Sequence, residues 1–143
     1  MGVEAMLENI PYLVPHGLEV RDRRGETEIR MPFRRGLTNY IGTVHAGALF
    51  TLAETAAGVA AHRIVPGGRA YILLRGATVR YTRRAEGEVA ASARVVAERA
   101  EAARADFDRE GRASAEVDVT MTDADGETVF EGAFDYALRP RKT

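Results

Sequence analysis

Residues 39–62 read NYIGTVHAGALFTLAETAAGVAAH and are the most informative part of the chain. Between Ala46 and Ala61 nearly every residue is small or apolar, and Glu54 is the single charge. A helix that is apolar on every side is typical of a protein core. Because burial of an unpaired carboxylate is costly, Glu54 needs either a partner or a function. We therefore predict one long central helix and treat Glu54 as the first candidate for chemistry.

Composition limits the classes of protein that fit. With 143 residues, 45% of them hydrophobic and 29% charged, the chain fits one domain, residues 1–143, that is large enough to bury a core. A net charge of −1 and 7% aromatic residues argue against a nucleic-acid partner. The absence of cysteine excludes disulfides and thiolate catalysis. The N-terminus has no basic stretch followed by a long apolar run, so we expect a cytoplasmic protein with no membrane partner.

The flanking sequence predicts further helices and strands. Before the central stretch, we expect a helix at 2–10, a hairpin of 17–23 and 26–31 around an Arg24-Gly25 turn, and a loop at 32–40. After it, we expect a central strand at 69–82, a strand at 88–96, a helix at 98–110 that ends at Gly111, and a hairpin of 113–122 and 128–138. Five or six antiparallel strands curled around one apolar helix would bury that helix on every side. This is the α+β hotdog arrangement.

One pattern in the central stretch resembles the N-x-x-G-x-x-H-G-G-x(6)-D/E signature of PaaI-like hotdog acyl-CoA thioesterases. The matching residues are Asn39, Gly42, His45, Ala46, Gly47 and Glu54. The later run Gly76–Tyr81 resembles the strand that follows the helix in that family. With Ala46 in place of the first glycine, and with its second helix, the chain is similar to a sparsely characterised branch of the superfamily. The resemblance covers about residues 32–138 and is more specific for the fold than for the substrate.

The resemblance implies an acyl-CoA thioesterase that is a homodimer or a dimer of dimers, with active sites between subunits. It implies water as the second substrate and no cofactor beyond the coenzyme A of the substrate. Glu54 takes the position of the catalytic acid, Asn39 and His45 would shape the pocket or position water, and the backbone N–H groups of Ala46 and Gly47 would polarise the thioester carbonyl. The residues expected to bind substrate are Gly42, Thr51, Arg80, Arg83 and Arg84.

Chemistry supports the same roles and adds a constraint. A helix N-terminus offers unpaired N–H groups and partial positive charge for an oxyanion, and Glu54 can serve as base or nucleophile. Glu54 follows Ala46 by eight residues, which corresponds to about 12 Å along a helix. The two groups cannot both contact one carbonyl. Either Glu54 is not catalytic, or each site takes its N–H groups from one chain and its carboxylate from another.

Other interpretations stay open at this point. Glu54 can be paired with an arginine, His45 can cap the helix, and Asn39 can be a turn residue. The arginines at 34, 35, 80, 83 and 84 can hold coenzyme A phosphates or belong to a solvated face. The histidines show no ligand spacing, so we expect no metal.

The activity has alternatives too. The second candidate is a non-catalytic module that binds acyl-CoA or lipid. A hotdog dehydratase is a third, but the paired Asp and His that such enzymes use at the start of the helix are missing.

Overall fold

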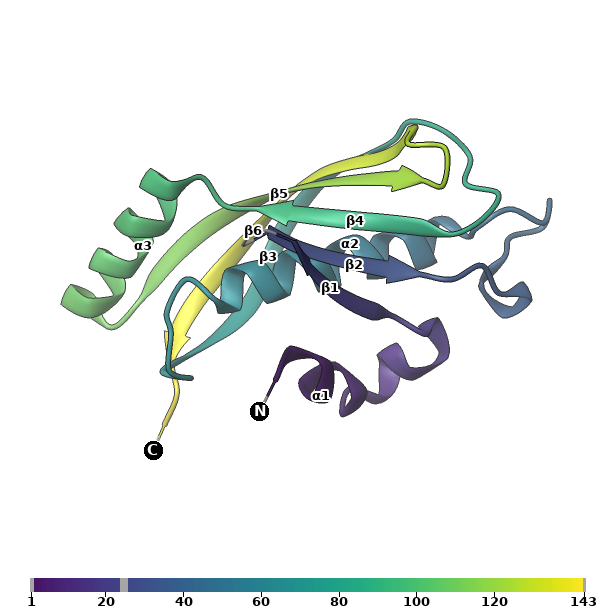
Figure 1. The fold of residues 1–143 in the computed structure, drawn as a ribbon. Helices are drawn as coiled ribbons and strands as arrows, with labels where there is room; N and C mark the ends of the chain where they lie inside the picture. Colours follow the sequence, from purple (N-terminus) through teal and green to yellow (C-terminus); the bar gives the residue numbers. More distant parts are fainter. Residues whose placement is uncertain (1, 24–25, 143) are drawn as a thin grey trace.

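The structure, a computed structural model, describes residues 2–23 and 26–142. Its six strands pair antiparallel in one sheet, in the order β1-β2-β4-β5-β6-β3. Their bounds are β1 Glu19–Arg23, β2 Glu26–Met31, β3 Ala70–Tyr81, β4 Val89–Arg94, β5 Ala113–Asp123 and β6 Thr128–Pro140. Figure 1 shows the curved sheet wrapped over one long helix, which confirms the predicted α+β hotdog fold.

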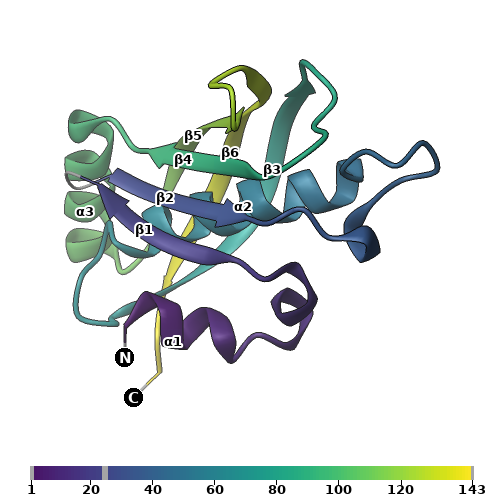
Figure 2. The same ribbon diagram turned by 45° about the vertical axis from the view of Figure 1, so that its right-hand side comes forward.

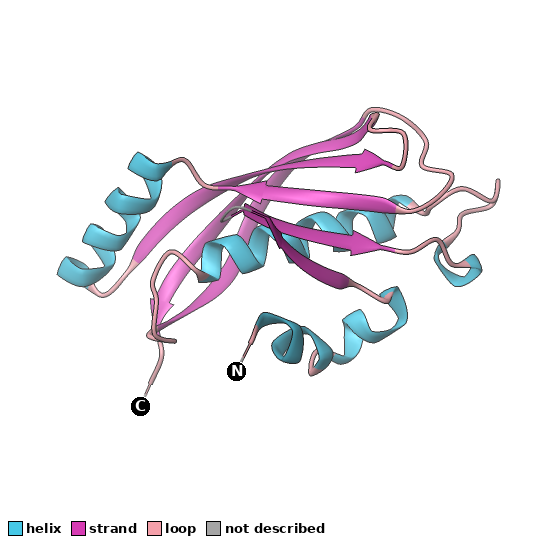
Figure 3. Ribbon diagram, in the orientation of Figure 1, coloured by secondary structure: helices cyan, strands magenta, loops and turns pink. Residues whose placement is uncertain are grey.

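Figure 3 shows the long central helix under the curved sheet and a second long helix at one end of the sheet. Their bounds are α1 Val3–Glu8, η1 Pro11–His16, η2 Arg35–Leu37, α2 Ala46–His62 and α3 Ala97–Glu110. The N-terminal segment, which we define as α1 and η1, lies beneath α2 in two views (Figures 1 and 2). Helix α3 packs Ala103 and Phe107 onto a small second core near one end of the sheet. None of the described helices is both long and apolar enough to cross a membrane.

The central helix is shorter and less enclosed than the sequence predicted. Helix α2 begins at Ala46, and residues 39–45 form a loop that leads into it. The helix starts there because His45 has an extended backbone, with φ −62° and ψ 138°, and its side chain caps the first turn. The expectation of burial on every side is also wrong, since Ala46 and Gly47 are exposed and Glu54 is half-buried. The sheet covers one face of α2, and it leaves the first turn open.

Strand β3 is at the edge of the sheet, and the prediction of a central strand is wrong for the single chain. It pairs only with β6, and its apolar side chains are therefore left in contact with solvent. Tyr71, Leu73, Leu74 and Tyr81 are 40%, 55%, 37% and 46% exposed. The β-branched and aromatic composition that indicated a strand does not report how many neighbours the strand has.

The remaining predicted elements are confirmed, with ends shifted by a few residues. The two hairpins β1-β2 and β5-β6 form, and β2 buries Thr27, Ile29 and Met31 as their alternation predicted. Helix α3 ends at Gly111, whose φ of 72° is a left-handed conformation that glycine adopts without strain. The predicted Arg24-Gly25 turn lies outside the described residues.

Gly132 of β6 provides a test of how tightly the sheet packs. A Cβ atom at this position would lie 2.9 Å from Phe134, 3.2 Å from Phe130 and 3.2 Å from Val79. We expect Gly132→Ala to lower the free energy of unfolding by about 1–3 kcal/mol, because the buried rings must move. Urea unfolding measures the change. Gly87→Ala is the matched control, since nothing lies within 4 Å of that Cβ position; equal stability losses in both variants would contradict the packing argument.

Candidate active site

The first turn of α2 has one free and one occupied backbone donor. The Nδ1 atom of His45 accepts a hydrogen bond from the N–H of Gly47 at 2.8 Å. Among the described residues, the N–H of Ala46 has no partner. Tyr81 at the end of β3 donates to the carbonyl of Ala46 at 3.1 Å, which places that strand beside the helix start. Ala46 is therefore the donor that the chain leaves available for a ligand, while the predicted Gly47 donor already serves the cap.

Asn39 organises the loop that precedes the helix. Its Oδ1 atom accepts from the N–H groups of Ile41 and Thr43 at 3.1 and 3.0 Å, and its Nδ2 donates to Thr43 Oγ1 at 2.8 Å. Gly42 in this loop has a φ of 82°, which a side chain would strain. These contacts give Asn39 and Gly42 a structural role in shaping the approach to α2.

Glu54 is bound to a residue that sequence reasoning missed. The hydroxyl of Tyr136 lies 2.6 Å from Glu54 Oε2 and 3.0 Å from the backbone carbonyl of Glu54. Burial, together with the charge and hydrogen bond of Glu54, raises the pKa of Tyr136 far above its usual range, so the hydroxyl stays protonated and donates. No described arginine forms an ion pair with Glu54. The inward alternation of Phe134, Tyr136 and Leu138 on β6 was the signal available in the sequence, since only Tyr136 carries a hydroxyl there.

The Glu54 cavity, a space of about 320 Å³, opens beside this carboxylate. Its walls come from α2, the N-terminal segment, β3 and the C-terminal end of the chain. Tyr12 of the N-terminal segment is hydrogen-bonded to Thr51, with 3.1 Å between the two hydroxyl oxygens. A Cβ atom at Gly58 would lie 3.6 Å from Glu54 Oε2, so this glycine helps to keep space beside the acid.

The predicted site residues fall into two groups along one unbroken helix. Asn39, His45 and Ala46 gather at its start, whereas Glu54 lies two turns further on. At about 1.5 Å per residue, the Ala46 N–H and the Glu54 carboxylate remain about 12 Å apart along the axis. Thr51 lies between the groups, and its hydroxyl donates to the carbonyl of Gly47 at 2.9 Å.

The candidate phosphate-binding arginines adjoin residues that contact the start of α2. Arg80 precedes Tyr81, which donates to the Ala46 carbonyl, and Arg84 precedes Ala85, whose carbonyl accepts from the N–H of Val44 at 2.8 Å. Arg80, Arg83 and Arg84 are all exposed. Arg83 and Arg84 share a surface cavity with acidic side chains, which are Glu86, Glu88, Asp123 and Asp125. Arg34 instead donates to the carbonyl of Pro15 at 3.1 Å, so it holds the N-terminal segment against the loop before α2.

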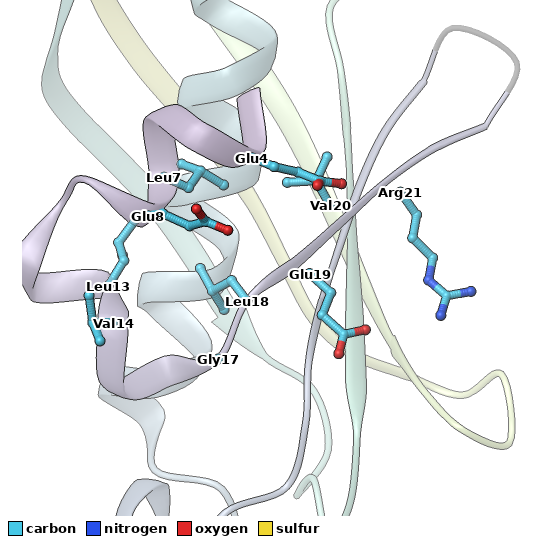
Figure 4. Close-up of a pocket in the computed structure, with 10 residues that line it drawn as sticks. All are labelled: Glu4, Leu7, Glu8, Leu13, Val14, Gly17, Leu18, Glu19, Val20 and Arg21. Carbon is cyan, nitrogen blue, oxygen red and sulfur yellow. The ribbon is translucent and has the colours of Figure 1, made fainter. Parts of the chain in front are cut away.

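A larger cavity, of about 640 Å³, lies on the other side of the N-terminal segment, between that segment and β1 (Figure 4). Leu7, Leu13, Leu18 and Val20 supply apolar side chains to its lining. It also includes three exposed carboxylates, which are Glu4, Glu8 and Glu19. It contains neither Glu54 nor the start of α2, so its size does not make it the candidate active site.

Because of the Tyr136 hydroxyl, we expect the free energy of unfolding to fall at alkaline pH. The pKa of this hydroxyl is raised in the folded protein above the ordinary value of 10.0, so the folded state keeps a proton that the unfolded chain releases. The stabilisation is complete below pH 10 and falls as the pH rises further, by up to about 1.4 kcal/mol per pH unit. Urea unfolding between pH 9 and 11 should show this decline in the wild type and a shallower one in Tyr136→Phe. Parallel curves for the two proteins would contradict the assignment.

Comparisons with known proteins identify the family of the chain. Residues 3–138 match the family described as "Domain of unknown function (DUF4442)". The crystal structure of PA5026 from Pseudomonas aeruginosa, a protein of unknown function described as a probable thioesterase, is 32% identical, with a TM-score of 0.84 over 99% of this chain and 97% of that one. No curated protein matches the sequence significantly.

Two more distant structures share the fold. The PaaI protein of the Escherichia coli phenylacetic acid degradation operon has a TM-score of 0.73 at 19% identity, over 98% of this chain and 91% of that one. The thioesterase HI1161 of Haemophilus influenzae has a TM-score of 0.79 at 14% identity, over 98% and 92%. The chain belongs to the DUF4442 family, and its fold is the hotdog fold of PaaI-like thioesterases.

Proposed function

We propose that the protein is an acyl-CoA thioesterase in which Glu54 acts on the thioester. The observation that carries the proposal is the half-buried carboxylate of Glu54, held by the Tyr136 hydroxyl at 2.6 Å and open to a cavity lined largely by apolar side chains. A carboxylate placed in this way can remove a proton from water or attack the carbonyl carbon directly. The 32% identity to a probable thioesterase supports the same reaction.

Hydrolysis also needs a donor for the oxyanion, and we propose that a second copy of the chain supplies it. The Ala46 N–H is exposed and available, but it belongs to the far end of the same helix. In a two-fold dimer that pairs β3 with the partner's β3, the partner helix runs in the opposite direction. Its first turn would then lie near Glu54, and the partner's Ala46 N–H would complete the site.

The exposed edge of β3 supports this dimer. A long edge strand with exposed apolar side chains is a hazard for aggregation unless another chain covers it. Leu73 is 55% exposed on that strand, and Tyr40 and Ile41, in the loop before α2, are 98% and 50% exposed. Pairing of two such edges would cover β3 and bring this loop against the partner. We propose a homodimer on this ground, alone or within a dimer of dimers.

Coenzyme A enters the proposal as part of the substrate, with no other cofactor. Arg80, Arg83 and Arg84 are the candidates for its phosphates, since guanidinium groups bind phosphate oxygens with two parallel hydrogen bonds. The carboxylates around Arg83 and Arg84 offset part of their charge, and Arg80 lies opposite Glu131 in the pairing of β3 with β6.

A screen of acyl-CoA esters tests the proposed activity. Release of free coenzyme A is followed with a thiol reagent, which is clean here because the protein has no cysteine. Hydrolysis of at least one ester, lost in Glu54→Gln, supports the thioesterase. Calorimetric binding of an ester without any thiol release would favour the non-catalytic acyl-CoA-binding module and overturn the enzyme assignment.

A further inference from the structure

The Glu54 cavity extends along one face of the second half of α2. The helix residues that line it are Glu54, Thr55, Gly58, Val59 and His62. This spacing follows a single helix face, and the span from 54 to 62 corresponds to about 12 Å at 1.5 Å per residue. The volume of about 320 Å³ is near the lower limit for pockets that enclose small organic ligands. The cavity is therefore long enough for an extended chain and too small for a bulky ligand.

The N-terminal segment forms the facing wall. It contributes Met6, Leu7, Ile10, Tyr12 and Leu13, so four of the five side chains are aliphatic or thioether groups. Leu7 and Leu13 are buried, and the hydrogen bond from Tyr12 to Thr51 ties the segment to α2. A wall of this composition suits a hydrocarbon chain, which gains free energy by leaving water.

The two ends of the cavity differ in chemistry. Glu54 with Tyr136 lies at one end, and His62 and Arg141 lie at the other. Burial and the nearby positive charge of Arg141 lower the pKa of His62, which leaves its ring neutral at pH 7. A hydrocarbon chain that continued past His62 would strip water from the Arg141 guanidinium without replacing those hydrogen bonds. The polar end is therefore a boundary for an apolar ligand.

We propose that the Glu54 cavity is the acyl subsite and that it selects thioesters of medium-length acyl chains, bounded by Glu54 at the reactive end and by His62 and Arg141 at the far end. An extended chain advances about 3.5 Å for every three bonds, so about 12 Å holds about ten bonds, which is an acyl chain of about ten carbons counted from the thioester sulfur. The inference rests on the proposed thioesterase function, and it adds the substrate class and the segment that sets it.

The first test is the chain-length profile of the wild-type protein. Acetyl-, butanoyl-, octanoyl-, decanoyl- and hexadecanoyl-CoA are compared by thiol release. We expect kcat/KM to rise at least about tenfold from acetyl- to octanoyl- or decanoyl-CoA, since each buried methylene contributes about 0.8 kcal/mol. It should then fall at least about tenfold for hexadecanoyl-CoA. A flat profile, or one that rises up to hexadecanoyl-CoA, overturns the inference and leaves the thioesterase assignment standing.

A variant of the N-terminal segment tests the cavity itself. Ile10 is 39% exposed, so Ile10→Trp can be accommodated without a change in the core while its ring occupies part of the cavity. We expect the preferred chain to become shorter, so that kcat/KM for butanoyl-CoA rises relative to kcat/KM for octanoyl-CoA. Val14→Trp is the matched control, because Val14 is 62% exposed on the same segment and lines the cavity next to β1 instead. Identical chain-length profiles for both variants would show that the N-terminal segment does not select the substrate.

A binding measurement tests the acyl subsite independently of the hydrolysis reaction. The wild-type chain has no tryptophan, so Ile10→Trp introduces a single fluorophore beside the cavity. Titration with hexanoate, octanoate, decanoate and hexadecanoate should change its emission, with the tightest binding by one of the shorter acids. If no acyl-CoA is hydrolysed, this result would still support the acyl subsite, although the proposed thioesterase activity would be wrong. An unchanged emission with every acid would overturn the subsite.

A pair of variants tests whether Arg141 limits the chain length at the far end of the Glu54 cavity. Arg141→Ala removes the guanidinium that lines the cavity, and Lys142→Ala removes an exposed charge from the next residue. We expect Arg141→Ala to raise kcat/KM for hexadecanoyl-CoA relative to that for octanoyl-CoA at least about fivefold, because the penalty for desolvating the charge is gone. The Lys142→Ala profile should equal that of the wild type. Equal responses of the two variants would contradict Arg141 as the boundary.

Discussion

Glu54→Gln is expected to lower kcat for acyl-CoA hydrolysis by at least about 100-fold while the protein stays folded. Glutamine keeps the length of the side chain and an oxygen that can accept from Tyr136, which lies 2.6 Å from the carboxylate in the wild type. It cannot accept a proton from water or act as a carboxylate nucleophile. Thiol release measures the loss of activity, and urea unfolding should show a change within about 1 kcal/mol.

Glutamine separates the two roles of Glu54 better than alanine does. Glu54→Ala would also leave the Tyr136 hydroxyl with only the backbone carbonyl of residue 54 as acceptor and cost about 0.5–1.5 kcal/mol of stability. Glu131→Gln provides the control, because it makes the same chemical change at an exposed position of β6. Wild-type turnover by Glu54→Gln, with the fold intact, would end the assignment of Glu54 as the reacting group.

Two inactive variants are expected to restore activity when their chains are mixed. Ala46→Pro removes the free backbone N–H at the first residue of α2, where proline is tolerated. His45 already has the extended backbone that a following proline requires, with φ −62° and ψ 138°. Glu54→Gln removes the carboxylate. In a mixed dimer, one site combines the intact N–H of one chain with the intact carboxylate of the other.

Unfolding and refolding an equal mixture makes half of the dimers mixed, and each mixed dimer has one complete site of two. About a quarter of wild-type activity should therefore return in a two-fold dimer. Each variant refolded alone should stay inactive, and Ala46→Gly, which keeps the N–H, should stay active. Native mass spectrometry counts the mixed dimers. Mixed dimers without activity would show that the donor and the acid do not serve one site from separate chains.

Local sequence patterns were sufficient to predict most of the fold. Alternation identified β2 and β5, the turn glycines marked element ends, and the apolar run marked α2, because these signals depend on neighbours within a few residues. The start of α2 at Ala46 was harder to predict from the sequence. It depends on the His45 side chain turning back onto the Gly47 N–H, and apolarity does not encode that geometry.

The position of β3 shows the limit of composition. Its residues have high strand propensity, so the strand itself was predictable. Whether a strand is central or at an edge depends on which other strands pair with it, and among the described strands β6 is the single partner of β3. The exposed Leu73 and Leu74 became visible only when this sheet order was known.

By itself, the sequence determined that Glu54 is the one acid in an apolar helix and that it lies too far along that helix to share a carbonyl with the Ala46 N–H of the same chain. Both statements follow from helical periodicity. Only the tertiary structure decided that Tyr136 binds Glu54 and that the N-terminal segment closes the cavity beside it. Tyr136 is 82 residues from Glu54, and Tyr12 is 39 residues from Thr51. Contacts over such separations are set by the packing of sheet, helix and N-terminal segment together, which no local pattern records.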